Sequence, residues 1–156
     1  MLPPAGKIDL GKHRSMMIQK WFDAVPGDAS RGLDIVRVMT ALNLMAHGVH
    51  GLFDPEGVRG FGGYLSSIGF PFGVGWVWAI IVIQIASSVL LILRRLVVPA
   101  CIGHLVILVA GVWLEHAPHG WYVVGPGANG MEYSVLLIAC LVAVLWTYWP
   151  PRAVAS

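Results

Sequence analysis

Four long apolar runs constrain the fold of this chain more than any other feature. They extend over residues 33–53, 72–93, 96–114 and 131–149. Each is close to the length of about 20 residues that a helix needs to cross the hydrocarbon core of a bilayer. Inside lipid the backbone has to satisfy its own hydrogen bonds, so each run predicts a helix. The sequence therefore predicts an all-α fold, an integral membrane bundle of four transmembrane helices.

The composition agrees with lipid as the solvent for much of the surface. Of the 156 residues, 57% are hydrophobic and only 12% are charged, whereas a soluble domain usually carries about 25% charged residues. The length suits one domain. We predict that residues 31–152 form this transmembrane domain and that residues 1–30 form an N-terminal extension. Basic residues do not interleave with aromatic ones in a soluble patch, so nucleic acid is not an expected partner.

The N-terminal extension contains its own pattern. Ile18, Trp21, Phe22 and Val25 recur at helical spacing, with lysine and arginine residues nearby. A helix with one apolar face and basic flanks typically lies in the plane of a membrane surface. We therefore predict an N-terminal amphipathic helix at the inner membrane surface.

The basic residues predict the orientation. Nine of the ten lysines and arginines lie on the side that holds both termini and the short link between the second and third runs, and only Arg59 lies on the other side. Cytoplasmic segments of membrane proteins carry such an excess of Lys and Arg. We therefore predict a multi-pass protein of the inner (plasma) membrane of the cell, with both termini in the cytoplasm and the bilayer as its main partner.

The first run carries a polar stripe. Thr40, Asn43, His47 and His50 follow one another at intervals of three or four residues, which places them on one face of a helix. Polar groups inside a membrane span usually face the bundle interior or a water-filled cavity. We therefore expect this stripe, which begins near mid-membrane and runs outward, to face the bundle interior or a water-filled cavity.

The other runs offer polar partners at two matching depths. The middle layer would contain Asn43, Gln84 and His104. The outer layer would lie where the helices meet the outer loops. Its members are His47, His50, Glu115, His116, His119 and Glu132.

Three interpretations of the outer layer stay open. A structural hydrogen-bond network would fix the helix packing. A quinone-headgroup or proton-relay site would use histidines, because their charge changes near neutral pH. A metal site would use histidines and carboxylates, although His47 and His50 are three residues apart and not four as in the familiar zinc helix motif.

Several segments resemble the DoxX family. They are RVMTALNLMAHGVHGLF at residues 37–53, GGYLSSIGFP at residues 62–71, LEHAPHG at the end of the third run and GMEYSVLL at the start of the fourth. The resemblance covers about residues 31–149 and implies a four-helix transmembrane fold in a membrane component of a redox system. Gln84 departs from the family, which often has an acidic residue there, and this weakens a proton-transfer role at that position.

We therefore expect a membrane subunit of a redox system that holds a quinone-like lipophilic ligand or relays protons, and the sequence leaves open whether it is an enzyme. His47 and His50 would contact the headgroup, and Glu132 with a neighbouring histidine would orient them. The residues assigned to the ligand or the proton relay are His47, His50, Glu132, His116, His119, Asn43, Gln84 and His104.

Two alternatives and the oligomeric state remain open. The chain would otherwise be a non-catalytic membrane anchor or assembly factor for a partner oxidoreductase, or it would hold a metal ion between histidines and carboxylates. Gly48, Gly51 and Gly111 permit close helix contacts, either within one chain or between the copies of a homo-oligomer.

Overall fold

The computed structural model describes residues 29–124 and 129–150, and every regular element among them is a helix. This confirms the prediction of an all-α protein. The described helices, apart from the first residues of α2, lie in one compact unit that begins at Gly32. The amphipathic helix predicted around residues 18–25 lies outside the described residues.

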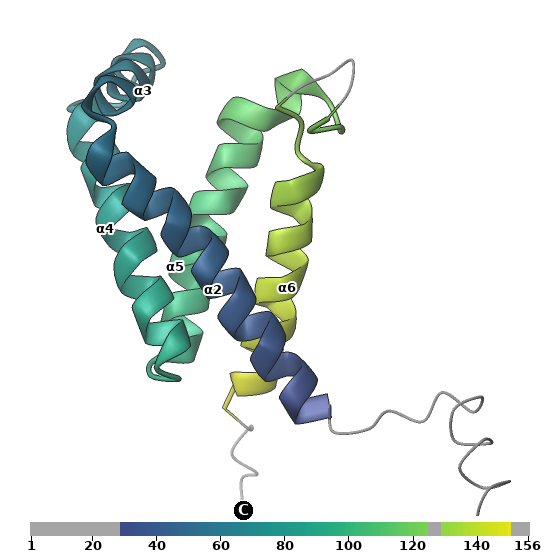
Figure 1. Ribbon diagram of the computed structural model, residues 1–156. Helices are drawn as coiled ribbons and strands as arrows, with labels where there is room; N and C mark the ends of the chain where they lie inside the picture. The colour runs from purple at the N-terminus through teal and green to yellow at the C-terminus, as the bar shows by residue number, and fades with distance from the viewer. Residues whose placement is uncertain (1–28, 125–128, 151–156) are drawn as a thin grey trace, which may run out of the picture. The chain divides into compact units, whose positions relative to one another are not determined.

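Helices cover all four apolar runs, and a further helix lies between the first two (Figure 1). Mean hydropathy is 2.2 for residues Gly73–Ile92 and 2.3 for residues Val97–His119, and both segments are long enough to cross a membrane. The elements are α2 (Ala29–Phe53), α3 (Pro55–Ser67), α4 (Gly73–Ile92), α5 (Val97–Gly111), the π-helix η1 (Val112–His116), the 3₁₀-helix η2 (Ala117–His119) and α6 (Glu132–Tyr148).

Consecutive helices α4, α5 and α6 pack side by side, and α2 crosses them (Figure 1). One end of the unit holds α3, η1, η2 and the start of α6. We call it the outer end, because the charge pattern predicts that it faces outward. The other, inner end holds the link between α4 and α5 and the last turn of α6. From the inner to the outer end, α2 and α6 diverge (Figure 1).

Two clusters of buried apolar side chains form the core. The larger one, the inner core, joins α2, α4, α5 and α6. The smaller one, the outer core, joins α3 to α4 through Val58, Leu65, Val77 and Ile81. The members of the inner core are Ala41, Leu44, Leu91, Val97, Ala100, Cys101, Leu137, Leu141 and Val144.

Helix α2 approaches α4 closely at Gly48 and at Gly51, where an added Cβ atom would lie 2.9 Å from Ile81 Cδ1. A Cβ atom added at Gly48 would lie 3.0 Å from Ile85 Cγ1 and 3.2 Å from Gln84 Cβ. Gly48 is buried, so its small size serves a contact within the chain. Gly111 has no neighbouring heavy atom within 4 Å of such a Cβ position.

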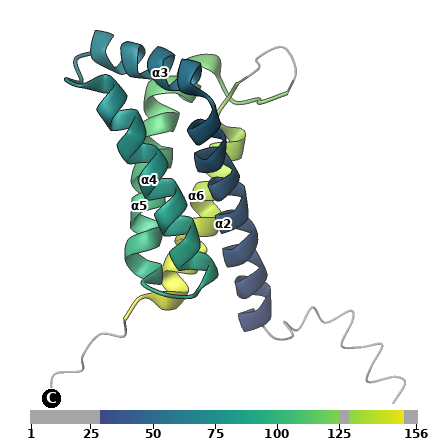
Figure 2. The same cartoon turned by 60° about the vertical axis from the view of Figure 1, so that its left-hand side comes forward.

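Helix α3 lies across the outer end (Figure 2). Its start is specified locally, because the Asp54 side chain accepts a hydrogen bond from Gly57 N at 2.9 Å and Pro55 occupies the first turn. Its last turn is held to α4 by Ser66 Oγ, which accepts from Gly73 N at 3.2 Å. Helix α3 therefore extends over 13 residues and ends at Ser67.

Candidate functional site

The predicted middle layer is divided between the interior and the surface. His104 is 0% exposed and Gln84 is 6% exposed, whereas Asn43 is exposed. Ser88 Oγ and His104 Nε2 lie 3.2 Å apart and form a hydrogen bond. Among the described residues, His104 Nδ1 is the buried side-chain nitrogen or oxygen that lacks a partner. The helices therefore enclose a polar centre, and Asn43 is not part of it.

The polar stripe of α2 changes its environment along the helix. Thr40 is buried, and Asn43, His47 and His50 are exposed. The stripe is therefore packed inside the bundle only at its inner end, and its outer part is exposed. The physical reason is the direction of α2, which stays close to α4 through Gly48 and diverges from α6 toward the outer end (Figure 1).

The four other predicted outer-layer residues lie at the outer end, in η1, η2 and the first turn of α6. Glu132 Oε1 accepts a hydrogen bond from Val123 N at 3.0 Å, and His116 Nδ1 lies 2.9 Å from the Asn129 carbonyl oxygen. Asn129 Nδ2 donates to Glu115 Oε1 at 3.2 Å, and His119 Nε2 lies 4.0 Å from the same oxygen. We call Glu115, His116, His119, Asn129 and Glu132 the loop cluster.

The loop cluster holds the connection between η2 and α6. Backbone hydrogen bonds pair the two sides of this connection, from Gly130 N to the Tyr122 oxygen at 3.0 Å and from Glu132 N to the Trp121 oxygen at 2.9 Å. These bonds join the two described sides of the connection, and the described residues there form no strand. The expectation that Glu132 and a neighbouring histidine orient His47 and His50 is not met among the described contacts, because these side chains bind the loop.

A further polar cluster lies at the inner end. Arg37 is 6% exposed. Its Nη1 donates to the Leu91 carbonyl and, at 3.3 Å, to the Ile92 carbonyl in the last turn of α4. Its Nη2 lies 3.1 Å from Asp34 Oδ1, and the Tyr148 hydroxyl donates to the same oxygen at 3.3 Å. This arrangement joins α2, α4 and α6.

Arg94 completes the inner cluster from the link after α4. Its Nη1 lies 3.9 Å from Asp34 Oδ2, and its guanidinium carbon lies 5.5 Å from the centre of the Tyr148 ring. Sequence reasoning did not find this cluster. An arginine inside an apolar run, three residues after an aspartate, was the available signal.

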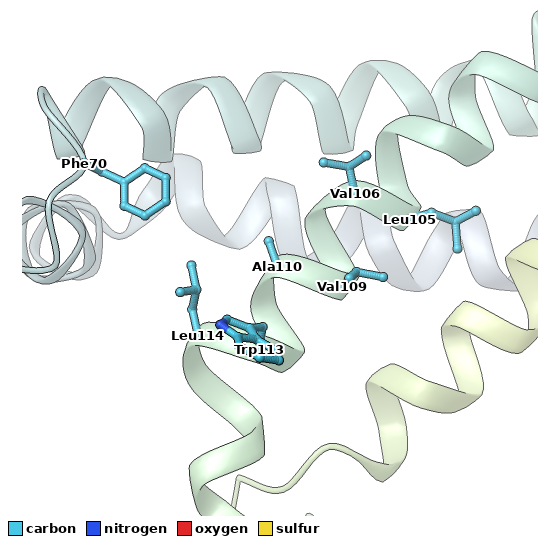
Figure 3. A pocket seen from close by; sticks show the side chains of 7 residues that line it. All are labelled: Phe70, Leu105, Val106, Val109, Ala110, Trp113 and Leu114. Carbon is cyan, nitrogen blue, oxygen red and sulfur yellow. The ribbon is translucent and has the colours of Figure 1, made fainter.

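An apolar groove of about 690 Å³ runs along the outer half of α5 (Figure 3). It lies on the opposite side of α5 from His104, because Val106, Val109 and Trp113 are exposed while His104 is buried. The groove is therefore separate from the polar centre around His104. Its lining residues are Phe70, Leu105, Val106, Val109, Ala110, Trp113 and Leu114.

The described residues offer no set of metal ligands. No three His, Cys, Asp or Glu side chains among residues 29–124 and 129–150 lie close enough to hold an ion. Cys101 and Cys140 are free thiols.

Two of the described helices are long and apolar enough to cross a membrane, and together with the family match that follows they support the class of helical membrane proteins. The sequence profile of the DoxX family matches residues 32–117, which is more than half of the chain and extends from α2 to η2. The chain therefore belongs to the DoxX family, as its sequence motifs indicate. The family does not assign a substrate. Neither the curated proteins nor the solved structures gave a match.

Proposed function

We propose that this protein is the membrane subunit of a redox system and that His47 and His50 bind the polar headgroup of a quinone-like lipophilic ligand or relay protons to it. In this proposal α2, α4, α5 with η1, and α6 all cross the inner membrane. Both termini lie in the cytoplasm, as the distribution of basic residues favours.

The observation that carries the proposal is the exposure of Asn43, His47 and His50 on a helix of a membrane protein. Ionisable and amide groups at membrane depth cost several kcal/mol unless they meet a polar partner. A neutral imidazole both donates and accepts a hydrogen bond, and quinone carbonyls accept hydrogen bonds. Because the histidines are exposed on the flank of α2, a ligand could reach them laterally from the bilayer.

The other predicted residues take supporting positions. Glu132 and His116 hold the loop at the outer end through their bonds to its backbone, and His119 lies 4.0 Å from the Glu115 carboxylate beside them. Gln84 and His104 belong to the buried centre further from the surface. The proposal therefore assigns contact with the headgroup to the histidines of α2, with Asn43 beside them.

The test is native mass spectrometry of the protein, purified gently from its own membrane, with lipid extraction in parallel. We expect a bound quinone in the wild type and its loss in the double variant H47A/H50A. The matched control is V49A/L52A, which removes two side chains of the same helix that are 38% and 46% exposed and have the same spacing. Quinone retained in H47A/H50A, or lost equally from the control, contradicts the proposal.

The same exposed stripe supports the second candidate, a non-catalytic anchor or assembly factor. There the polar side chains of α2 would bind a helix of a partner oxidoreductase through interhelical hydrogen bonds. This candidate predicts an empty protein that co-purifies with a redox enzyme, and loss of that enzyme in H47A/H50A.

A further inference from the structure

The link between α4 and α5 joins the two helices whose length and hydropathy suit a membrane span. Helix α4 ends at Ile92 and α5 begins at Val97, and the two helices pack against each other. With both helices as membrane spans, as proposed above, the chain leaves the hydrocarbon core where it turns, so this link lies at the depth of the lipid headgroups. The residues of the link are all exposed, and they are Leu93, Arg94, Arg95 and Leu96.

The charge at this end of the molecule is positive. Among the described residues from Gly32 onward, the inner end carries Arg37, Arg94 and Arg95 against one carboxylate, that of Asp34. Nη2 of Arg37 lies 3.1 Å from Asp34 Oδ1, so the buried Arg37 already balances this carboxylate. The charges of Arg94 and Arg95 are therefore not balanced within the part of the chain that the structure describes.

The side chain of Arg94 is held in place without being enclosed. Its Nη1 lies 3.9 Å from Asp34 Oδ2, and its guanidinium carbon lies 5.5 Å from the centre of the Tyr148 ring. The side chain is nevertheless 60% exposed, and a guanidinium has five N–H donors. Arg95 has no side-chain partner among the described residues. Both arginines can therefore donate to a further group.

Exposed apolar side chains accompany the two arginines. Leu93 and Leu96 precede and follow them in the link and are 63% and 68% exposed. Trp146 and Trp149, at the end of α6, are 83% and 58% exposed at the same end of the molecule (Figure 1). Tryptophans are typical of the interface between lipid and water. A free phosphate ion would use the arginines alone, whereas a phospholipid would use the arginines and the apolar side chains.

We infer that Arg94 and Arg95 bind the headgroup of an anionic phospholipid, with its acyl chains beside Leu93 and Leu96. The planar fork of a guanidinium fits two phosphate oxygens at once. The unbalanced charge favours a headgroup with a net negative charge over a zwitterionic one, whose own cation offsets the phosphate. Arg94 and Arg95 take this role through the membrane spans proposed above, independently of any ligand at His47 and His50.

The test is native mass spectrometry of the protein in a neutral detergent with equal amounts of phosphatidylglycerol and phosphatidylcholine. We expect the wild type to bind phosphatidylglycerol preferentially. The variant R94Q/R95Q is expected to lose affinity for this lipid roughly 30-fold, about fivefold for each arginine. The matched control is R59Q, which removes an exposed arginine at the outer end and is expected to bind like the wild type.

Two further variants guard against a change of fold and separate charge from geometry. R95Q alters a side chain without a partner among the described residues, so its fold is expected to stay intact, and its affinity is expected to fall about fivefold. R94K/R95K keeps both charges without the planar fork and is expected to bind more weakly than the wild type and more tightly than R94Q/R95Q. Helical circular dichroism checks the fold of each variant.

The outcomes are distinct. Equal binding of both lipids by the wild type, unchanged binding in R95Q and R94Q/R95Q, or an equal loss in R59Q overturns the inference. Displacement of the lipid by inorganic phosphate at the same concentration also overturns it, because the ligand would then be a free phosphate. Selective lipid binding by a wild type that holds no quinone supports the inference and contradicts the function proposed for His47 and His50. A quinone bound without any lipid selectivity does the reverse.

Discussion

Replacement of Arg37 by methionine should destabilise the folded protein more than any other single change at the inner end. The substitution keeps an apolar stem and removes the guanidinium. Two hydrogen bonds to carbonyls in the last turn of α4 are lost, each worth about 1.5–3 kcal/mol for a charged donor. The ion pair with Asp34 adds at most about 1 kcal/mol, because that carboxylate is 39% exposed.

We therefore expect the free energy of unfolding to fall by about 3–5 kcal/mol, the usual cost of breaking a buried charged contact. The assay is equilibrium unfolding in mixed micelles with increasing SDS, followed by helical circular dichroism. Arg37→Lys keeps the charge without the planar fork of donors, so an intermediate loss is expected.

The matched control for Arg37 is Arg95→Met, in the exposed link after α4. A surface substitution of this kind usually changes stability by less than about 0.5 kcal/mol. The reasoning is refuted if Arg37→Met costs less than about 1 kcal/mol, or if Arg95→Met costs as much as Arg37→Met.

Two further predictions concern packing. Gly73→Ala would place a Cβ 1.9 Å from the Gly62 carbonyl oxygen, so it should separate α3 from α4 and cost more than about 2 kcal/mol in the same assay. Gly75→Ala meets its nearest atom at 3.9 Å and should be close to neutral. Ser88→Ala leaves both ring nitrogens of His104 unpaired and should cost about 1–3 kcal/mol. Adding His104→Leu should recover most of that loss, and a double variant less stable than Ser88→Ala would contradict the assignment.

The positions of the long helices could be predicted because lipid permits few backbone structures. The length of α3 could not. Its sequence contains four glycines within 13 residues, and glycine lowers helix propensity by about 1 kcal/mol relative to alanine. One of these four glycines, Gly62, instead allows close packing, because it lies against Gly73 of α4 where the two helices meet. Propensity alone cannot distinguish a helix breaker from a packing residue.

The sequence predicts which residues belong to the loop cluster better than it predicts which atoms these residues bind. Sequence position was enough to place Glu115, His116 and Glu132 at one end of the bundle. The length of each helix determines at which end its first and last residues lie. The partners of Glu132 and His116 are a backbone N–H and a backbone carbonyl in the loop. Backbone partners have no side-chain signature in a sequence, and for the same reason the contact of Arg37 with the end of α4 was missed.

The polar stripe shows why periodicity alone does not define a site. Spacing places Thr40, Asn43, His47 and His50 on one face of α2, but the direction of the helix decides what that face meets. Two contacts fix this direction, the Arg37 cluster at the inner end and the close approach to α4 at Gly48. Together they pack the inner part of the stripe and leave its outer part exposed. The residues that hold α2 in place are thus separated from the histidines, so a variant at His47 and His50 can test ligand binding without removing the contacts that stabilise the helix.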